Sequence, residues 1–159
     1  IEINSLNYFS LSRLFKLGTE VNILASTRKL MTNYYASIVQ AADFSPTASS
    51  KNVFNPAFRA NSYVTAGLKP IFVFNDNLQL RGEVHAFMPI REILKDEFSD
   101  NAYYGNWLSK PHFSAEIALV ANLPFASLSA FADYKDYPTG NWNFGISFGL
   151  FFLAPRFID

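Results

Sequence analysis

The 159-residue sequence contains no cysteine, which excludes disulfides, thiolate metal sites and cysteine nucleophiles. It also has no net charge, because 13 basic side chains balance 13 acidic ones, and this balance argues against a nucleic-acid partner. Its apolar runs, such as residues 148–155 with Gly149 inside, are far shorter than the roughly 20 residues that a membrane-spanning helix needs. The shortness of the apolar runs excludes a helical membrane protein.

Alternation of apolar and polar residues is abundant, in a chain that is 50% hydrophobic and 17% aromatic. Side chains on a strand point to opposite faces with a period of two, so such alternation predicts a strand with one apolar face. The clearest example is residues 78–88. One face there carries Leu78, Leu80, Gly82, Val84, Ala86 and Met88, and the other carries Gln79, Arg81, Glu83, His85 and Phe87.

Six further segments follow this pattern, and together they predict one all-β domain of seven antiparallel strands over residues 1–159. The six are residues 2–11, 17–25, 62–74, 113–123, 125–134 and 142–152. Leu24 is the one residue that breaks the alternation of residues 17–25. Pro70 has no N–H to donate to a neighbouring strand, so we expect a bulge or a strand end there.

The predicted connections alternate between short and long, which is typical of outer-membrane β-barrels with short periplasmic turns and longer external loops. Residues 12–15, 75–77 and 122–124 are the short turns, and residues 27–61, 89–111 and 135–141 are the long connections. This alternation holds only if residues 33–42 are not a strand. Their apolar side chains recur every three to four residues, which predicts a short helix in an external loop, with Thr32 at its N-cap.

The long connections contain two other features with predicted structures. Residues 44–61 are rich in Ser, Asn and Pro and lack phosphate-cradling glycines, so we expect a surface loop. The second long connection carries acidic and basic side chains at close spacing, which predicts a short solvated helix. These side chains are Arg91, Glu92, Lys95, Asp96, Glu97 and Asp100.

Three features favour a transmembrane β-barrel over a soluble barrel or sandwich, which also alternates. The apolar faces are long enough to cross a bilayer with tilted strands of roughly 9–11 residues. Aromatic side chains such as Phe74, Phe113 and Trp142 gather near strand ends, as interfacial girdles do. The polar faces carry ionisable groups near strand centres, where a soluble core rarely accepts them. These groups are Glu20, Lys69, Arg81, Glu83, His85 and Glu116.

We interpret these six groups as a polar network inside a barrel, because charges there must be paired or hydrated. Seven strands cannot close a bacterial barrel, which usually has an even number, and a lipid-exposed edge is not tolerated. We therefore expect further strands, or a second copy of the chain, to complete the wall.

The motif GxSxG around Ser147 matches the nucleophile elbow of serine hydrolases. That elbow needs a strand, a sharp turn and a helix, whereas Ser147 lies inside an alternating segment. We therefore interpret the match as false and expect no catalytic residue. The only two histidines, His85 and His112, show no metal-ligand spacing, so we expect neither a metal nor another cofactor.

Three segments resemble the C-terminal barrel portion of the outer-membrane patatin-like phospholipases of Bacteroidetes. They are VFNPAFRANSYVTAGLKPIF (residues 53–72), LQLRGEVHAFMPIR (78–91) and NWNFGISFGLFF (141–152). The resemblance implies that the chain is the last part of a barrel, usually of sixteen strands, in the bacterial outer membrane. It also implies a preceding patatin domain with a Ser–Asp dyad, which is absent from these residues, so Ser147 does not match the family's nucleophile.

The resemblance implies that the chain anchors, and helps to export or present, a lipid hydrolase without being an enzyme itself. The chain's partners would then be membrane lipids, the hydrolase domain and the strands that complete the barrel. Two alternatives stay open at this point. One is a pore or transport barrel with Arg81, Glu83 and Glu116 lining a channel, and the other is a soluble barrel that binds a lipid inside.

Overall fold

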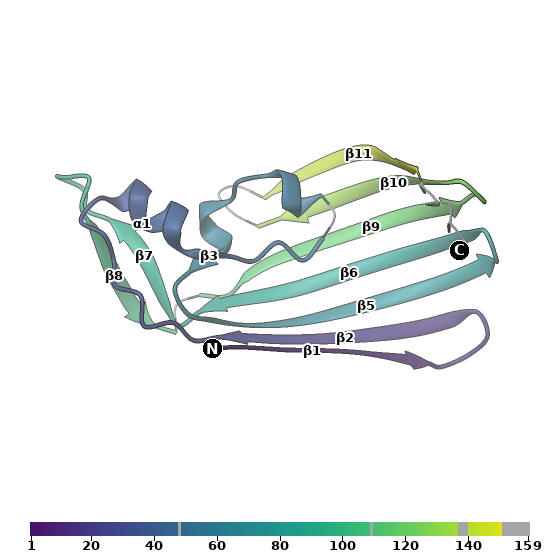
Figure 1. Cartoon of the computed structure of the whole chain (residues 1–159), viewed down its shortest axis with the longest axis horizontal. Coiled ribbons are helices and arrows are strands. Elements are labelled where there is room, and N and C mark those ends of the chain that lie inside the picture. Colours follow the sequence, from purple (N-terminus) through teal and green to yellow (C-terminus); the bar gives the residue numbers. More distant parts are fainter. Residues whose placement is uncertain (48, 109, 137–139, 151–159) are drawn as a thin grey trace, which may run out of the picture.

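The computed structural model describes residues 1–47, 49–108, 110–136 and 140–150, and this part of the chain is all-β with one short helix. Seven strands form one antiparallel sheet in which each strand pairs with the next in the order of the chain (Figure 1). They are β1 (Glu2–Ser10), β2 (Phe15–Leu24), β5 (Tyr63–Asn75), β6 (Leu78–Pro89), β9 (His112–Asn122), β10 (Ala126–Lys135) and β11 (Asn141–Leu150). The predicted seven antiparallel strands are thus confirmed.

Cross-strand register places the alternating residues on two distinct faces of this sheet. Directly opposed residues share a face, and Val84 of β6 lies opposite Leu68 of β5 and Ala115 of β9. On the other face, Glu83 lies opposite Glu116. We call these the apolar face and the polar face. The register thus agrees with the faces counted from the sequence.

The apolar face is uncovered along its length. On it, side chains of all seven strands of the sheet reach the surface, and Phe144 and Ile146 are each 78% exposed. Further exposed members are Ile3, Val21, Leu68, Val84, Ile117 and Leu128. None of the helices in the described residues is long and apolar enough to cross a membrane. Predicted Phe152, which would extend this face beyond β11, lies outside the described residues.

The prediction of a bulge or strand end at Pro70 is wrong. Pro70 lies inside β5 opposite Leu17 of β2, and the pairing of β5 with β6 keeps the same register before and after it. The irregularity in β5 falls instead between Val73 and Asn75, next to the turn. Gly82 of β6 leaves room for the ring, because a Cβ there would lie 3.1 Å from Pro70 Cγ.

The short turns lie at one end of the sheet, and the additional elements lie at the other (Figure 1). Helix α1 (Tyr34–Gln40) confirms the predicted helix, but Asn33, not Thr32, is its N-cap, because Asn33 Oδ1 accepts a hydrogen bond from the Ala36 amide at 3.2 Å. The second long connection holds a hairpin of β7 (Arg91–Lys95) and β8 (Ala102–Trp107), not the predicted solvated helix.

This hairpin forms because its side chains have partners that a solvated helix would not give them. Ile93 of β7 packs in a small hydrophobic cluster with Ile38 and Ala41 from the end of α1. The guanidinium of Arg91 lies over the rings of Tyr104 and Trp107, at 4.6 and 5.6 Å from the ring centroids. The hydrogen bond from Lys95 to Asp100, with a distance of 2.7 Å between Nζ and Oδ1, raises the pKa of Lys95.

Residues 42–60, which we call the docked segment, fold back onto the polar face of the sheet. The segment contains β3 (Ala42–Asp43), η1 (Ser50–Asn52), η2 (Pro56–Phe58) and β4 (Arg59–Ala60), and β3 pairs with β4. Phe44 is 6% exposed and Phe58 is 4% exposed. The prediction of a surface loop over residues 44–61 is therefore wrong, because Phe44 and Phe58 are buried against the strands.

Candidate functional site on the polar face

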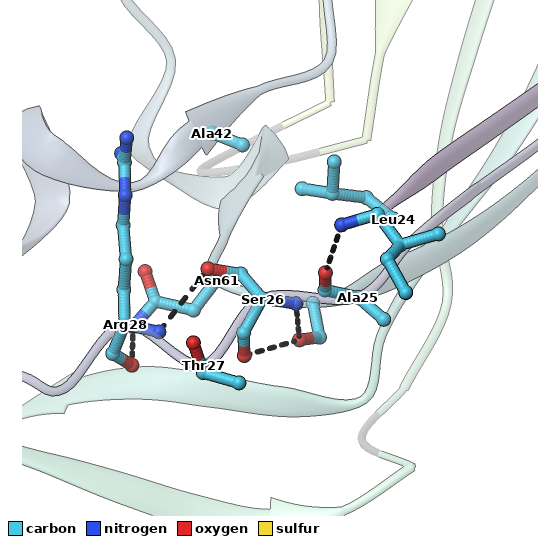
Figure 2. Close-up of a pocket in the computed structure, with 9 residues that line it drawn as sticks. Leu24, Ala25, Ser26, Thr27, Arg28, Ala42 and Asn61 are labelled. Atoms are coloured by element: carbon cyan, nitrogen blue, oxygen red, sulfur yellow. Dashed lines mark hydrogen bonds between the residues drawn. The ribbon is translucent and has the colours of Figure 1, made fainter.

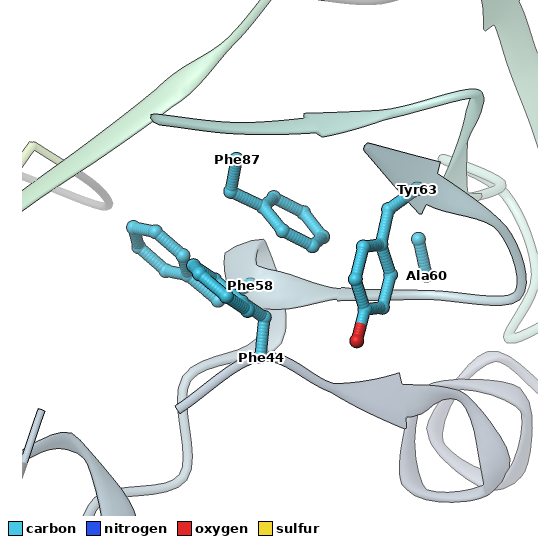
Figure 3. Close-up of a cluster of buried hydrophobic side chains, with 5 residues drawn as sticks. All are labelled: Phe44, Phe58, Ala60, Tyr63 and Phe87. Carbon is cyan, nitrogen blue, oxygen red and sulfur yellow. The ribbon is translucent and has the colours of Figure 1, made fainter. Parts of the chain in front are cut away.

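An aromatic cluster of Phe44, Phe58, Tyr63 and Phe87, which also includes Ala60, fixes the docked segment to the polar face (Figure 3). Phe87 of β6 is completely buried and stacks on Phe44, with 5.6 Å between ring centroids and 17° between planes. Leu24 of β2 packs against the same cluster. The contact explains why Leu24, the one residue that breaks the alternation of its strand, is apolar on the polar face.

Next to this cluster, Lys69 of β5 joins two carboxylates on the polar face. Its Nζ lies 2.8 Å from Glu20 Oε2 on β2 and 3.4 Å from Glu83 Oε2 on β6. The same Glu83 oxygen lies 3.2 Å from Nε2 of His85, whose ring meets Phe44 edge-on. The structure thus brings four of the six sequence-predicted network residues together.

The glycine opposite His85 is needed for this packing. Gly67 of β5 and His85 of β6 are cross-strand partners. A Cβ on Gly67 would lie 2.4 Å from His85 Nδ1, far inside van der Waals contact. The histidine ring therefore occupies the space that any other residue at position 67 would fill.

The fifth predicted residue, Glu116 of β9, is bonded to the docked segment instead of to a cation. Its Oε2 accepts hydrogen bonds from the Ser49 hydroxyl at 2.5 Å and from the Ser49 amide at 3.3 Å. The side chain is buried, and a buried carboxylate needs such donors. Glu116 therefore holds the far side of the docked segment against the sheet.

The sequence reasoning missed further charged residues on this face, among them Lys16 of β2 and a pair on β10. Asp133 and Lys135 of β10 are both buried, and Lys135 Nζ lies 3.0 Å from Asp133 Oδ2. Asn143 of β11 donates a hydrogen bond of 3.2 Å to the same oxygen. The signal was present for Asp133, which alternates with Ala132 and Tyr134 in the predicted strand of residues 125–134, whereas Lys135 fell in the predicted connection of residues 135–141.

Removing the cation of the Lys69 network is expected to destabilise the protein. In Lys69→Met, Glu20 and Glu83 lose their shared partner, and a lost hydrogen bond to a charged group costs about 1.5–3 kcal/mol. The free energy of unfolding, measured by urea titration in detergent micelles, reports the change. Lys69→Arg keeps the charge and is the control, and equal stability of both variants with the native chain would show that the network contributes nothing.

Arg81, the sixth predicted residue, has no ion pair or side-chain hydrogen bond with any other described residue. It lies one row further from the docked segment than Glu83, towards the short turns, and is exposed. Together with Lys16 and Lys69 it lines a cavity of about 400 Å³ on the polar face. Tyr8, Ile71 and Glu83 also line this cavity.

A second, larger cavity of about 610 Å³ lies at the opposite end of the sheet, where β2 leaves it (Figure 2). Most of its polar side chains are bonded to the backbone around it. Ser62 Oγ accepts a hydrogen bond of 3.0 Å from the Ser26 amide, and Asn61 Nδ2 donates one of 3.3 Å to the Arg28 carbonyl. We find no pair of acid and base among its lining residues.

The GxSxG residues lie in strand β11, paired with β10, where Ser147 lies opposite Ser129 and Gly145 opposite Phe131. A Cβ on Gly145 would lie 2.5 Å from Phe131 Cζ, so this glycine makes room for an aromatic ring. Among the described residues, no group of three or more His, Cys, Asp or Glu side chains is placed to hold a metal ion.

Comparison of the chain with models of known protein families, with curated proteins and with solved structures finds no match in any of the three. The arrangement of the two faces is therefore the evidence on function. One face is apolar and exposed, and the other carries ionisable groups, part of which the docked segment covers.

Proposed function

We propose that this chain is part of the wall of an outer-membrane β-barrel, with the apolar face towards lipid and the polar face towards the barrel interior. The observation that carries the proposal is the exposure of the apolar face along the seven strands. Monomeric soluble proteins rarely expose an apolar patch larger than a few hundred Å². Lipid is the partner that an apolar surface of this length fits, since strands of 9–13 residues cross a bilayer.

The edges of the sheet support the same proposal. Strands β1 and β11 each pair on one side only within the described residues. Unpaired backbone groups cost several kcal/mol each in hydrocarbon, so membrane-spanning sheets are closed. Further strands, or a second copy of the chain, therefore complete the wall on both sides in this proposal.

The resemblance to the patatin-like phospholipases extends the proposal to a biological role. In this role the wall anchors, and helps to export or present, a lipid hydrolase domain, and it contributes no catalytic residue. Hydrolysis of phospholipid esters by purified residues 1–159, abolished by Ser147→Ala, would contradict the proposal that the wall contributes no catalytic residue.

The orientation of the two faces is testable with spin labels, and the lack of native cysteine makes single labelling sites unambiguous. Labels at Ala115, Ile117 and Leu119 of β9 face lipid in this proposal, and labels at Ala118 and Val120 face the interior. In phospholipid bilayers we expect oxygen, which partitions into hydrocarbon, to collide most with the first three labels. A water-soluble nickel complex should collide most with the other two.

A reversed pattern would turn the apolar face inward and would favour the soluble lipid-binding barrel. Uniform exposure of all five labels to the nickel complex would mean that β9 does not enter the bilayer. Electron paramagnetic resonance power saturation measures both collision rates on the same samples, so each label is its own control for local mobility.

A further inference from the structure

The charges on the polar face are divided between its two halves. The half nearer the docked segment contains the carboxylates of Glu20, Glu83, Glu116 and Asp133, and Glu83 also lines the cavity of about 400 Å³ together with its partner Lys69. Each of them has a partner there, among them Lys69, Ser49 and Lys135. Ion pairs and hydrogen bonds within this half therefore compensate the negative charges of these four carboxylates.

The half near the short turns has a different composition. From the row of Arg81 to the ends of the strands, the polar face carries only two charged side chains in the described residues, and both are basic: Arg81 of β6 and Lys16 of β2. Neither has an ion pair or a side-chain hydrogen bond with another described residue. The turns at this end add Arg13 and Asp76, one charge of each sign.

Lys16 and Arg81 are placed to act on the same ligand. Ile71 of β5 lies opposite Lys16 on one side and opposite Arg81 on the other, so the three residues form one row on the polar face. Neighbouring strands are about 4.8 Å apart, which puts the backbones of the two cations about 10 Å from each other. Both side chains line the 400 Å³ cavity that opens at this row.

We propose that Lys16 and Arg81 bind an anion with a phosphate or carboxylate group in this cavity. The inference rests on the proposed function, because that function makes the polar face a water-filled interior. Arginine offers a planar fork of donors that matches both groups, and the lysine ammonium adds a point charge. A free guanidinium beside low-dielectric walls attracts anions more strongly than one in open water.

The experiment uses Ile71→Cys, whose thiol lies between the two cations in a chain without other cysteines. Its reaction rates with a negatively charged sulfonate thiosulfonate reagent and with a positively charged trimethylammonium reagent are measured in phosphatidylcholine vesicles. Both rates are divided by those of a small free thiol. We expect the normalised rate ratio to favour the sulfonate about tenfold, as two unit charges within about 10 Å predict.

Neutralising the cations is expected to remove this preference. In Ile71→Cys combined with Lys16→Gln and Arg81→Gln, the normalised ratio should fall to about 1. The matched control is Asn143→Cys on the same face, next to the Asp133 carboxylate, where no preference for the sulfonate is expected. A ratio near 1 at Ile71→Cys, or one unchanged by the two glutamines, would overturn the proposal.

Competition identifies the anion and its source. If 50 mM inorganic phosphate slows the sulfonate reaction in phosphatidylcholine vesicles, the site binds a soluble phosphate. If only phosphatidylglycerol in the vesicles slows it, the ligand is a lipid headgroup. If neither slows it, the cations attract anions without binding them, and the proposal is wrong.

Failure of the proposed function gives a different result in the same assay. A thiol in hydrocarbon reacts with neither reagent, because the reactive thiolate needs water. If Ile71→Cys were inert to both reagents and Phe72→Cys on the apolar face reacted, the two faces would be reversed. If Phe72→Cys is inert and Ile71→Cys reacts without preference, the wall is correct and the anion site is not.

Discussion

Val84→Arg is expected to destabilise the membrane-inserted protein by about 2–4 kcal/mol, the cost of an arginine on the lipid face near the midplane of a β-barrel. Val84 lies near the middle of β6 and is 51% exposed on the apolar face. Its cross-strand neighbours Leu68 and Ala115 offer no counter-ion. In the proposed orientation the charge therefore meets hydrocarbon.

Two changes on the polar face of the same strand serve as controls. Gln79→Arg adds the same side chain two rows from Glu83 and is expected to change stability by less than about 1 kcal/mol, because an interior arginine stays hydrated. Glu83→Gln should also be mild, since Glu20 remains as a partner for Lys69. Urea unfolding in lipid vesicles measures all three. A cost confined to the polar-face variants would invert the assignment of the faces.

Phe87→Ala is expected to release the docked segment from the sheet. Phe87 has no exposed surface, and its ring centroid lies 5.0 Å from that of Tyr63 and 5.6 Å from those of Phe44 and Phe58. Truncating a buried phenylalanine costs about 3–5 kcal/mol. Because most contacts of this ring are with the segment, we expect the loss to appear there more than in the strand pairing.

Limited proteolysis separates these two effects. Trypsin cleaves after Lys51 and Arg59 of the docked segment, and cleavage at both is expected to become much faster in Phe87→Ala, while the β-sheet circular dichroism is retained. Phe113→Ala on the apolar face is the matched control, since Phe113 is 48% exposed and touches no part of the segment's aromatic cluster. Equal protection in both variants would show that Phe87 does not hold the segment.

The strands of this protein are predictable from its sequence because their signal is local. Most of the strands repeat a period-two pattern over about ten residues, and the register of β5, β6 and β9 keeps those patterns on common faces. Hydrophobic residues such as Val84 and Ile117 recur on one side, and Glu83 and Glu116 occur on the other. The pattern therefore predicts which face of the sheet each side chain lies on, without any knowledge of tertiary contacts.

The docked segment was not predictable because its stability comes from contacts distant in the sequence. Ser49 is bonded to Glu116, 67 residues away, and Phe44 stacks on Phe87. Its composition of Ser, Asn and Pro is typical of exposed loops. The one local sign was on the strands, where the large apolar or aromatic side chains of Leu24, Tyr63 and Phe87 lie together on the face that carries the ionisable groups.

The hairpin of β7 and β8 was also not predictable from local sequence patterns. Charged residues at close spacing indicate a solvated helix, but alternate residues of β7 instead meet α1 and the aromatic rings of β8. For the candidate site, the sequence predicted the six ionisable groups from Glu20 to Glu116 on β2, β5, β6 and β9, but not Lys16 of β2. It did not show that Glu116 bonds to a serine of the docked segment or that Arg81 has no counter-ion.

The docked segment is the second half of the connection between β2 and β5, which are neighbours in the sheet, and the hydrogen bond from the Ser26 amide to Ser62 Oγ closes the base of this connection. Both ends are therefore tethered beside the surface on which it docks. Tethering gives an effective concentration in the millimolar range for a short flexible connection. Undocking is then a local, reversible event, and a free peptide of the same sequence would compete only at comparable concentrations.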